Sequence, residues 1–144
     1  MKTGAPLEFT AIRSIAATPA EVWQAITDPA QVSQYHLAPL RTMELHPGGK
    51  VRYGTDEQEM ISGKVLEVVP ERKLVHTFRF APTLEGTRDD PESTVSYHLE
   101  AGDGETRLLL VHSGFPEENQ TYANISGGWP HLLDALKAFV ERGR

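Results

Sequence analysis

Residues 93–113 contain the feature that most limits what this chain can fold into. Two segments of alternating polar and apolar residues flank the dipeptide Asp103-Gly104. This dipeptide favours a two-residue turn between antiparallel strands, and such a turn fixes the register of the whole hairpin. In that register Glu100 lies opposite Arg107, which gives a favourable cross-strand charge pair. The sequence therefore predicts an antiparallel sheet that includes these two strands.

The same register predicts which face of the hairpin points into the protein, because successive side chains alternate between the two faces of a strand. The face without charged groups is expected to be the inner one, and it carries Val95, Tyr97, Leu99, Leu108, Leu110 and His112. The outer face carries Ser96, His98, Glu100, Arg107, Leu109 and Val111. Leu109 and Val111 are apolar residues on this outer face, so they are candidates for a protein contact, including a homodimer contact.

A second amphipathic pattern occupies the C-terminal segment SGGWPHLLDALKAFVERG, residues 126–143. Its apolar residues have the i, i+3, i+4, i+7 spacing of a helix, and they are Trp129, Leu132, Leu133, Leu136, Phe139 and Val140. Two starting points fit the sequence: near Gln120 with a kink at Pro130, or at Gly128. In the second case we expect the Gly127-Gly128 pair to let the chain enter the helix close to the sheet. Only the sheet is large enough to bury this apolar stripe.

The remaining segments predict an α+β fold with one domain over residues 1–144. The opening segment LEFTAIRSIAAT alternates like a strand. Thr18 then begins a helix as its N-cap, with Glu21 completing a capping box. The Asp28-Pro29 dipeptide separates this helix from a shorter one expected over residues 30–35. Short strands and turns follow, so the predicted order is one strand, two short helices, about six antiparallel strands and one long helix.

The expected turn at Glu71-Arg72 bears on the candidate site. If it is a two-residue turn, Glu67 lies opposite His76 on the inner face of the next hairpin. Leu66 and Val68 offer a competing apolar face, so a different register is the alternative. With the first register, the inner side of the sheet collects four polar residues among aliphatic ones: Glu67, His76, Tyr97 and His112. Polar groups on a concave apolar surface are typical of a small-molecule pocket.

Three residues are candidates for catalysis, namely Glu67, His76 and His112. A carboxylate beside an imidazole can orient the ring and raise its basicity, which is the arrangement of a general base. The alternative is that these groups form structural hydrogen bonds. Ligand-binding candidates are the aromatic and neighbouring residues expected on the inner face or at its rim: Tyr35, His36, Tyr53, His76, Phe78, Tyr97, His112, Tyr122, Trp129 and Leu133. We expect no metal and no cofactor, because the six histidines show no ligand spacing and cysteine is absent.

Charge and composition exclude several classes of partner. The net charge is −6, from 20 acidic and 14 basic residues, and no cluster of Lys and Arg occurs. We therefore expect no nucleic-acid binding and no attraction to anionic membranes. No apolar run reaches the roughly 20 residues needed to span a bilayer, so membrane insertion is not expected. The absence of a signal-peptide pattern and of cysteine favours a cytoplasmic location.

Five segments taken in order resemble a known family. They are TPAEVWQAITDPAQVSQY, HPGGKVRY, GKVLEVVPERKLVHTF, TRLLLVHSGF and GGWPHLLDALKAFVE. Together they resemble the START-like (SRPBCC, helix-grip) superfamily, and within it the group named after the activator of the heat-shock protein 90 ATPase. The resemblance extends from about Phe9 to Arg142. It implies a single START-like domain with a curved seven-stranded antiparallel sheet around a long C-terminal helix, two short helices after the first strand, and a cavity between sheet and helix.

The resemblance also orders the functional hypotheses. Members of this superfamily bind lipids, hormones, polyketides or other apolar ligands, and some cyclise or hydrolyse them. The first hypothesis is therefore binding of a small, mostly apolar ligand in the internal cavity. The alternatives are a hydrolase or cyclase with a Glu67–His76 or His112 general base, and a co-chaperone-like interaction module. No catalytic residue set transfers from the family, so we expect a binding protein rather than an enzyme. The sequence does not include the additional N-terminal domain of the eukaryotic co-chaperones, so the resemblance alone does not predict a chaperone partner.

Overall fold

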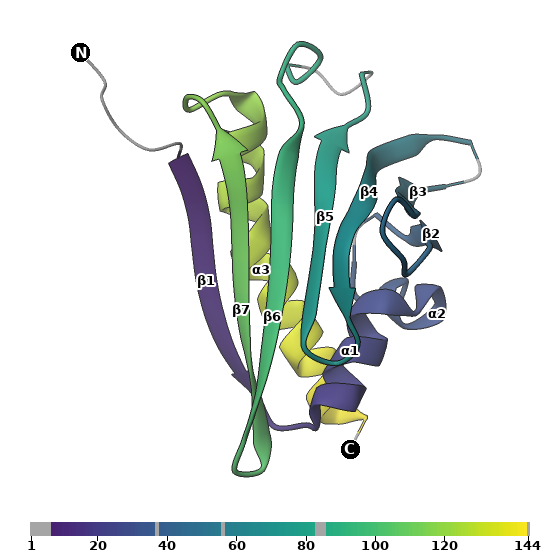
Figure 1. Ribbon diagram of the computed structural model, residues 1–144, viewed down its shortest axis with the longest axis vertical. Helices are drawn as coiled ribbons and strands as arrows, with labels where there is room; N and C mark the ends of the chain where they lie inside the picture. Colours follow the sequence, from purple (N-terminus) through teal and green to yellow (C-terminus); the bar gives the residue numbers. More distant parts are fainter. Residues whose placement is uncertain (1–6, 37, 56, 83–85, 144) are drawn as a thin grey trace.

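The computed structural model describes residues 7–36, 38–55, 57–82 and 86–143, and it shows the predicted α+β architecture (Figure 1). The elements in chain order are β1 (Leu7–Ile15), α1 (Pro19–Thr27), α2 (Pro29–Val32), β2 (Leu40–Met43), β3 (Lys50–Gly54), β4 (Glu59–Val69), β5 (Lys73–Phe80), β6 (Ser93–Gly102), β7 (Glu105–Phe115) and α3 (Gln120–Arg142). None of the helices in the described part of the chain has both the length and the apolar character needed to cross a membrane.

The seven strands form one curved antiparallel sheet in the order β1-β7-β6-β5-β4-β3-β2. Helix α3 runs diagonally across one face of this sheet, and the short helices α1 and α2 lie on the same side (Figure 1). Four of the six residues of the predicted α3 stripe are in the core, namely Trp129, Leu133, Leu136 and Val140, while Leu132 and Phe139 are partly buried against it. This helix-grip arrangement confirms the expected fold.

The β6–β7 hairpin has the predicted register. Glu100 lies opposite Arg107, and Tyr97 lies opposite Leu110. All six residues assigned to the inner face are buried: Val95, Tyr97, Leu99, Leu108, Leu110 and His112. A two-residue turn and a charge pattern were thus sufficient to orient strands β6 and β7.

Helix α1 begins with the predicted capping box. The Thr18 hydroxyl accepts a hydrogen bond from the Glu21 backbone N–H at 3.2 Å, and the Glu21 carboxylate accepts one from the Thr18 N–H at 2.9 Å. Asp28 ends α1 and caps α2, because its carboxylate accepts from the Ala30 N–H at 3.1 Å. Helix α2 is one turn of residues 29–32, so the expected extent of 30–35 was too long.

The expected β4–β5 register was wrong. Val65 rather than Glu67 lies opposite His76, and Glu67 lies opposite Val75. The connection contains three residues instead of two, with Glu71 in the left-handed region at a φ of 65°, and a bulge lies before it, near Leu66 in β4. The bulge turns Leu66 outward, where it is 45% exposed, and it leaves both Val65 and Val68 in contact with the core.

Of the two starting points considered for the last helix, the structure shows the earlier one. Asn119 caps α3 by accepting a hydrogen bond from the Tyr122 N–H at 2.8 Å, and Pro130 lies inside the helix. The expected close approach at Gly127-Gly128 is absent. Both glycines are exposed in the helix interior, and a Cβ added to either would meet no atom within 4 Å. Gly128 lines a cavity, and the absence of a side chain there leaves space in it.

Candidate functional site

A cavity of about 480 Å³ lies between α3, the strands β4 and β5, and the segment after α2. Its volume falls within the roughly 300–1,000 Å³ range of small-molecule pockets. The lining is almost wholly apolar, and its residues are Tyr35, His36, Ala38, Met60, Ile61, Phe78, Phe80, Asn124, Ile125, Gly128, Trp129, His131, Leu132 and Ala135. None of these described lining residues is Lys, Arg, Asp or Glu.

Three small residues keep this space open. Ala38 lies on the segment after α2, while Gly128 and Ala135 lie on the part of α3 that faces the cavity. A Cβ at Gly128 would point into empty space, so the missing side chain leaves volume that larger residues would fill. The aromatic rings of Phe78 and Trp129 form walls around the space. The lining thus combines small residues on α3 and on the segment after α2 with large aromatic ones.

A second and much smaller void, of about 10 Å³, adjoins the cavity. It is lined by Ile26, Tyr35, His36, Tyr53, Tyr97, Trp129, Leu132, Leu133 and Leu136. Four of these residues also line the large cavity: Tyr35, His36, Trp129 and Leu132. A void of this size holds at most about one water molecule. The void therefore lies next to the cavity and is too small to hold a ligand.

Three tyrosines around this void have neutral, hydrogen-bonded hydroxyls. The Tyr35 hydroxyl donates to the Ala25 carbonyl at 2.7 Å. The hydroxyls of Tyr53 and Tyr97 are hydrogen-bonded to each other. Burial raises the pKa of Tyr53 to about 12 and raises the pKa of Tyr35 and Tyr97 well above the usual value of 10. These phenols are therefore not sources of a phenolate base at neutral pH.

His36 lines both the cavity and the small void. Its Nδ1 accepts a hydrogen bond from the Ala38 backbone N–H at 3.0 Å, and its ring stacks on Tyr53 with centroids 4.9 Å apart and planes at 29°. Burial lowers the pKa of His36 from 6.5 to about 4. The ring is thus neutral at pH 7 and held in one orientation by the two contacts.

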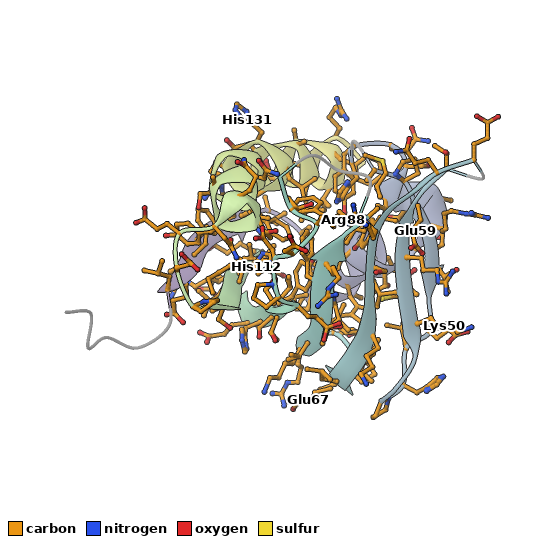
Figure 2. The ribbon with its side chains drawn as sticks, turned by 90° about the horizontal axis from the view of Figure 1, so that it is seen from above. Lys50, Glu59, Glu67, Arg88, His112 and His131 are labelled. Carbon is orange, nitrogen blue, oxygen red and sulfur yellow. The ribbon has the colours of Figure 1, made fainter. Side chains whose placement is uncertain are left out.

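The side chain of His112 lies between the sheet and α3 (Figure 2). It is the central member of a hydrogen-bonded chain. The Trp129 indole N–H donates to His112 Nδ1 at 3.0 Å, and His112 Nε2 lies 2.7 Å from the Ser93 hydroxyl. Since Nδ1 is the acceptor, Nε2 carries the proton and donates to Ser93, whose hydroxyl donates to the Phe78 carbonyl at 3.3 Å. Burial, and secondly the neighbouring His76, lowers the pKa of His112 to about 3. Both ring nitrogens are therefore occupied.

The expected pairing of Glu67 with His76 does not occur. Glu67 projects from the outer face of the sheet, away from α3, and its carboxylate lies 3.0 Å from Lys73 Nζ (Figure 2). His76 is 1% exposed and its Nδ1 donates to the Thr77 carbonyl at 2.7 Å, while its Nε2 is buried without a partner. Burial lowers the pKa of His76 to about 4. The three-residue turn and the bulge are the physical cause of this separation.

The structure divides the ten expected ligand-binding residues into three groups. The large cavity is lined by Tyr35, His36, Phe78 and Trp129, and the small void also by Tyr53, Tyr97 and Leu133. Neither space is lined by His76, His112 or Tyr122. His76 and His112 lie in the core, and Tyr122 packs edge-on against Phe115 with ring centroids 5.1 Å apart.

Sequence reasoning missed most of the apolar wall of the cavity. The lining residues not anticipated are Ala38, Met60, Ile61, Phe80, Asn124, Ile125, Gly128, His131, Leu132 and Ala135. Phe80 follows Phe78 by two positions on the same strand face, so strand alternation could have identified it. The residues from Asn124 to Gly128 required the earlier start of α3. Across the described residues, no group of three or more His, Asp or Glu side chains is arranged to hold a metal ion.

The family model described as "Activator of Hsp90 ATPase homolog 1-like protein" matches residues 16–141. The chain belongs to this family. The match covers α1 through α3, which includes every element that lines the cavity. The resemblance found in the five sequence segments is thereby confirmed. Among curated proteins, none matches this member of the family.

Solved structures with this fold come from several organisms. Protein MLL2253 from Mesorhizobium loti has a TM-score of 0.82 and 23% identity, with 96% of this chain and 99% of that chain covered. The Aha1 dimer from Colwellia psychrerythraea has a TM-score of 0.75 and 19% identity, with 96% and 98% covered. PFC0360w, an HSP90 activator from Plasmodium falciparum, has a TM-score of 0.75 and 20% identity, with 93% and 96% covered. At these identities the comparison shows a shared fold.

Proposed function

We propose that this protein binds a small, mostly apolar molecule in the cavity between α3 and strands β4 and β5. The observation that carries the proposal is a cavity of about 480 Å³ whose described lining contains no Lys, Arg, Asp or Glu. Such a surface is unfavourable in contact with water, and a ligand that covers it gains about 25 cal/mol for each Å² of apolar surface removed from water. Met60, which lines the cavity and is 38% exposed, gives an apolar ligand a contact surface where the cavity meets solvent.

Thermal stabilisation by a panel of neutral hydrocarbons, alcohols, ketones and esters tests the proposal. A compound at 100 times its dissociation constant stabilises the native state by about 2.7 kcal/mol, which for a chain of this size raises Tm by roughly 5–10 °C. If no compound in the panel raises Tm, the proposal is wrong.

Two adjacent glycines provide a matched pair of variants for locating the binding. Gly128 lines the cavity, whereas Gly127 does not, and both are exposed helix residues with open space around an added Cβ. Gly128→Leu should fill part of the cavity and abolish the stabilisation by a bound compound. Gly127→Leu makes the same change in helix propensity outside the cavity, so it should bind like the unmodified protein. Equal binding by both variants would place the compound elsewhere.

An Hsp90-activating role is the second candidate. Its support is the family to which the chain belongs and the Plasmodium falciparum HSP90 activator of the same fold. The measurement is the ATPase rate of purified Hsp90 with and without this protein. An increase that survives Gly128→Leu would separate this role from ligand binding, and an unchanged rate over a range of concentrations would exclude it.

The sequence also raised two other hypotheses, namely a hydrolase or cyclase activity and a homodimer. For the hydrolase or cyclase, the expected Glu67–His76 pair is not formed, and both ring nitrogens of the alternative base His112 are hydrogen-bonded. A homodimer stays a prediction, supported by the dimeric Colwellia psychrerythraea relative. Leu109 and Val111 are half-buried on the outer face of β7, and Ile12, opposite Leu109, is 55% exposed. Light scattering of the purified protein measures the mass directly.

A further inference from the structure

One polar group lies on the wall of this apolar cavity with an unused hydrogen-bond donor. The Nδ1 of His36 accepts from the Ala38 backbone N–H, so Nδ1 carries no proton. In a neutral imidazole the proton is then on Nε2, which makes Nε2 a donor. No described residue accepts from Nε2. Because His36 lines the cavity, this donor is available to a ligand bound there.

The large cavity and the small void share one wall, and the other polar side chains of this wall have no unused hydrogen-bond donor. The Tyr35 hydroxyl donates to the Ala25 carbonyl, and the Trp129 indole N–H donates to His112. Two further polar lining residues, Asn124 and His131, belong to α3 and not to the wall shared with the small void. The Asn124 Oδ1 accepts from Gln120, a bond that leaves the Asn124 amide N–H groups unused, and His131 is exposed. On the wall shared with the small void, His36 is thus the described side chain with a free donor.

The His36 ring is also held in place before a ligand arrives. The Ala38 N–H fixes one ring atom at 3.0 Å, and the stack on Tyr53 fixes the plane of the ring. A donor that is already oriented loses little side-chain entropy when it forms a hydrogen bond to a ligand. The apolar surroundings strengthen that bond, because water competes less effectively there.

We propose that the cavity recognises a neutral molecule with a hydrogen-bond acceptor, a carbonyl or ether oxygen, which accepts from His36 Nε2–H while the rest of the molecule is apolar. This inference rests on the proposed function and narrows it to a ligand class. A carboxylate is excluded by the same wall, since none of its described residues is Lys or Arg and an unpaired buried charge is strongly unfavourable. Burial also keeps His36 neutral, with a pKa of about 4, so the ring supplies a donor and no positive charge at pH 7.

Three probe molecules of similar size separate the effects of a hydrogen-bond acceptor, of apolar contact alone and of a negative charge. Butyrophenone carries one carbonyl acceptor, butylbenzene has the same carbon skeleton without an acceptor, and 4-phenylbutyrate carries an anion. Dissociation constants at pH 7 are measured by titration calorimetry for the full chain and for two variants of His36. His36→Asn places an amide oxygen about where Nδ1 lies, so it keeps the bond to Ala38 and removes the donor. His36→Gln places an amide N–H near the Nε2 position and keeps the donor.

The expected result is a loss specific to the ketone. His36→Asn should weaken butyrophenone about tenfold, as is typical of one lost hydrogen bond, and leave butylbenzene within twofold. His36→Gln should restore most of the butyrophenone affinity, and 4-phenylbutyrate should bind the unmodified protein at least tenfold more weakly than the ketone. Melting temperatures of both variants show that each is folded at the temperature of the titration.

The outcomes distinguish this inference from the proposed function. If butylbenzene binds and His36→Asn weakens both neutral probes equally, or neither, the cavity binds apolar molecules but His36 does not select an acceptor, and the inference is wrong. Tight binding of 4-phenylbutyrate would also overturn it. If the unmodified protein binds none of the three probes, the inference falls together with the proposed cavity function.

Discussion

The indole N–H of Trp129 donates a 3.0 Å hydrogen bond to Nδ1 of His112 and so connects α3 to strand β7 of the sheet. The bond continues through Ser93 on β6 to the Phe78 carbonyl on β5, so one chain of donors and acceptors spans the helix and three adjacent strands. Trp129 also lines the cavity, so the same residue bonds the helix to the sheet and forms part of the cavity wall.

Trp129→Phe should destabilise the protein more than the same change at Trp23. The variant removes the donor and leaves His112 Nδ1 buried without a partner, which costs about 1–3 kcal/mol beyond the lost packing. Trp23 is also buried, at 5% exposure, but its indole N–H makes no hydrogen bond to a described residue. Urea unfolding of both variants measures the difference. Equal destabilisation would show that the bond to His112 contributes nothing to stability.

The parts of the fold that the sequence predicted are those in which local chemistry and burial agree. Asp103-Gly104 adopts the turn, with Gly104 at a φ of 70°, and the charge pair Glu100–Arg107 confirms the register. The capping box at Thr18 depends on residues three positions apart. In these cases a few neighbouring residues determine the geometry without help from distant contacts.

The candidate site was predicted less well, because its geometry depends on distant contacts. Strict alternation along β4 would place Val65 and Val68 on opposite faces of the sheet. The bulge near Leu66 shifts this alternation, so that both residues contact the core. His36 was identified as a rim residue, yet its tautomer follows from a hydrogen bond to Ala38 that only the folded loop creates. The cavity itself depends on where α3 lies relative to β4 and β5.

Gly127→Ala should stabilise the protein by about 1 kcal/mol, because alanine is a much better helix former than glycine and an added methyl group meets no atom within 4 Å. Gly104→Ala is the matched control. It also meets no atom within 4 Å, but Gly104 has a φ of 70° in the β6–β7 turn. An alanine there adopts an unfavourable backbone conformation, so this variant should be destabilised. Thermal unfolding measures the change in Tm of each variant, which should be positive for Gly127→Ala and negative for Gly104→Ala. A change of the same sign in both would contradict the backbone explanation.

Gly63→Ala should be strongly destabilising. A Cβ at Gly63 would collide with the backbone carbonyl of Thr77 on the adjacent strand β5. Backbone atoms cannot move aside without breaking the β4–β5 pairing, so the cost should reach or exceed the roughly 1–3 kcal/mol typical of overpacking. Gly102→Ala is the comparison, since its Cβ would meet only the Glu105 side chain at 3.4 Å and the backbone at 3.7 Å. A tolerated Gly63→Ala, judged by the urea midpoint, would show that the strands can separate here.

Stability should fall steeply as the pH drops below neutrality, because three histidines are neutral in the native state. The pKa values of His36 and His76 are lowered to about 4 and that of His112 to about 3, all by burial in the first place. The unfolded chain titrates near 6.5, so between about pH 6.5 and 4 it binds more protons than the native state does. The stabilisation is complete above pH 6.5 and is lost as the pH falls. Each histidine contributes a slope of up to about 1.4 kcal/mol per pH unit.

Urea unfolding at pH 7, 6 and 5 tests this dependence in a window where carboxylates of ordinary pKa contribute little. Between pH 7 and 5 the loss should be about 2 kcal/mol for each of the three histidines. His36→Asn removes one titrating group and keeps an acceptor for the Ala38 N–H, so its loss over the same window should be smaller by about a third. His46→Gln, on an exposed turn, should reproduce the unmodified dependence. A stability that does not change between pH 7 and 5 would mean that none of the three histidines resists protonation in the native state. If His36→Asn and His46→Gln reduced the pH-dependent loss equally, burial of His36 would not contribute to it.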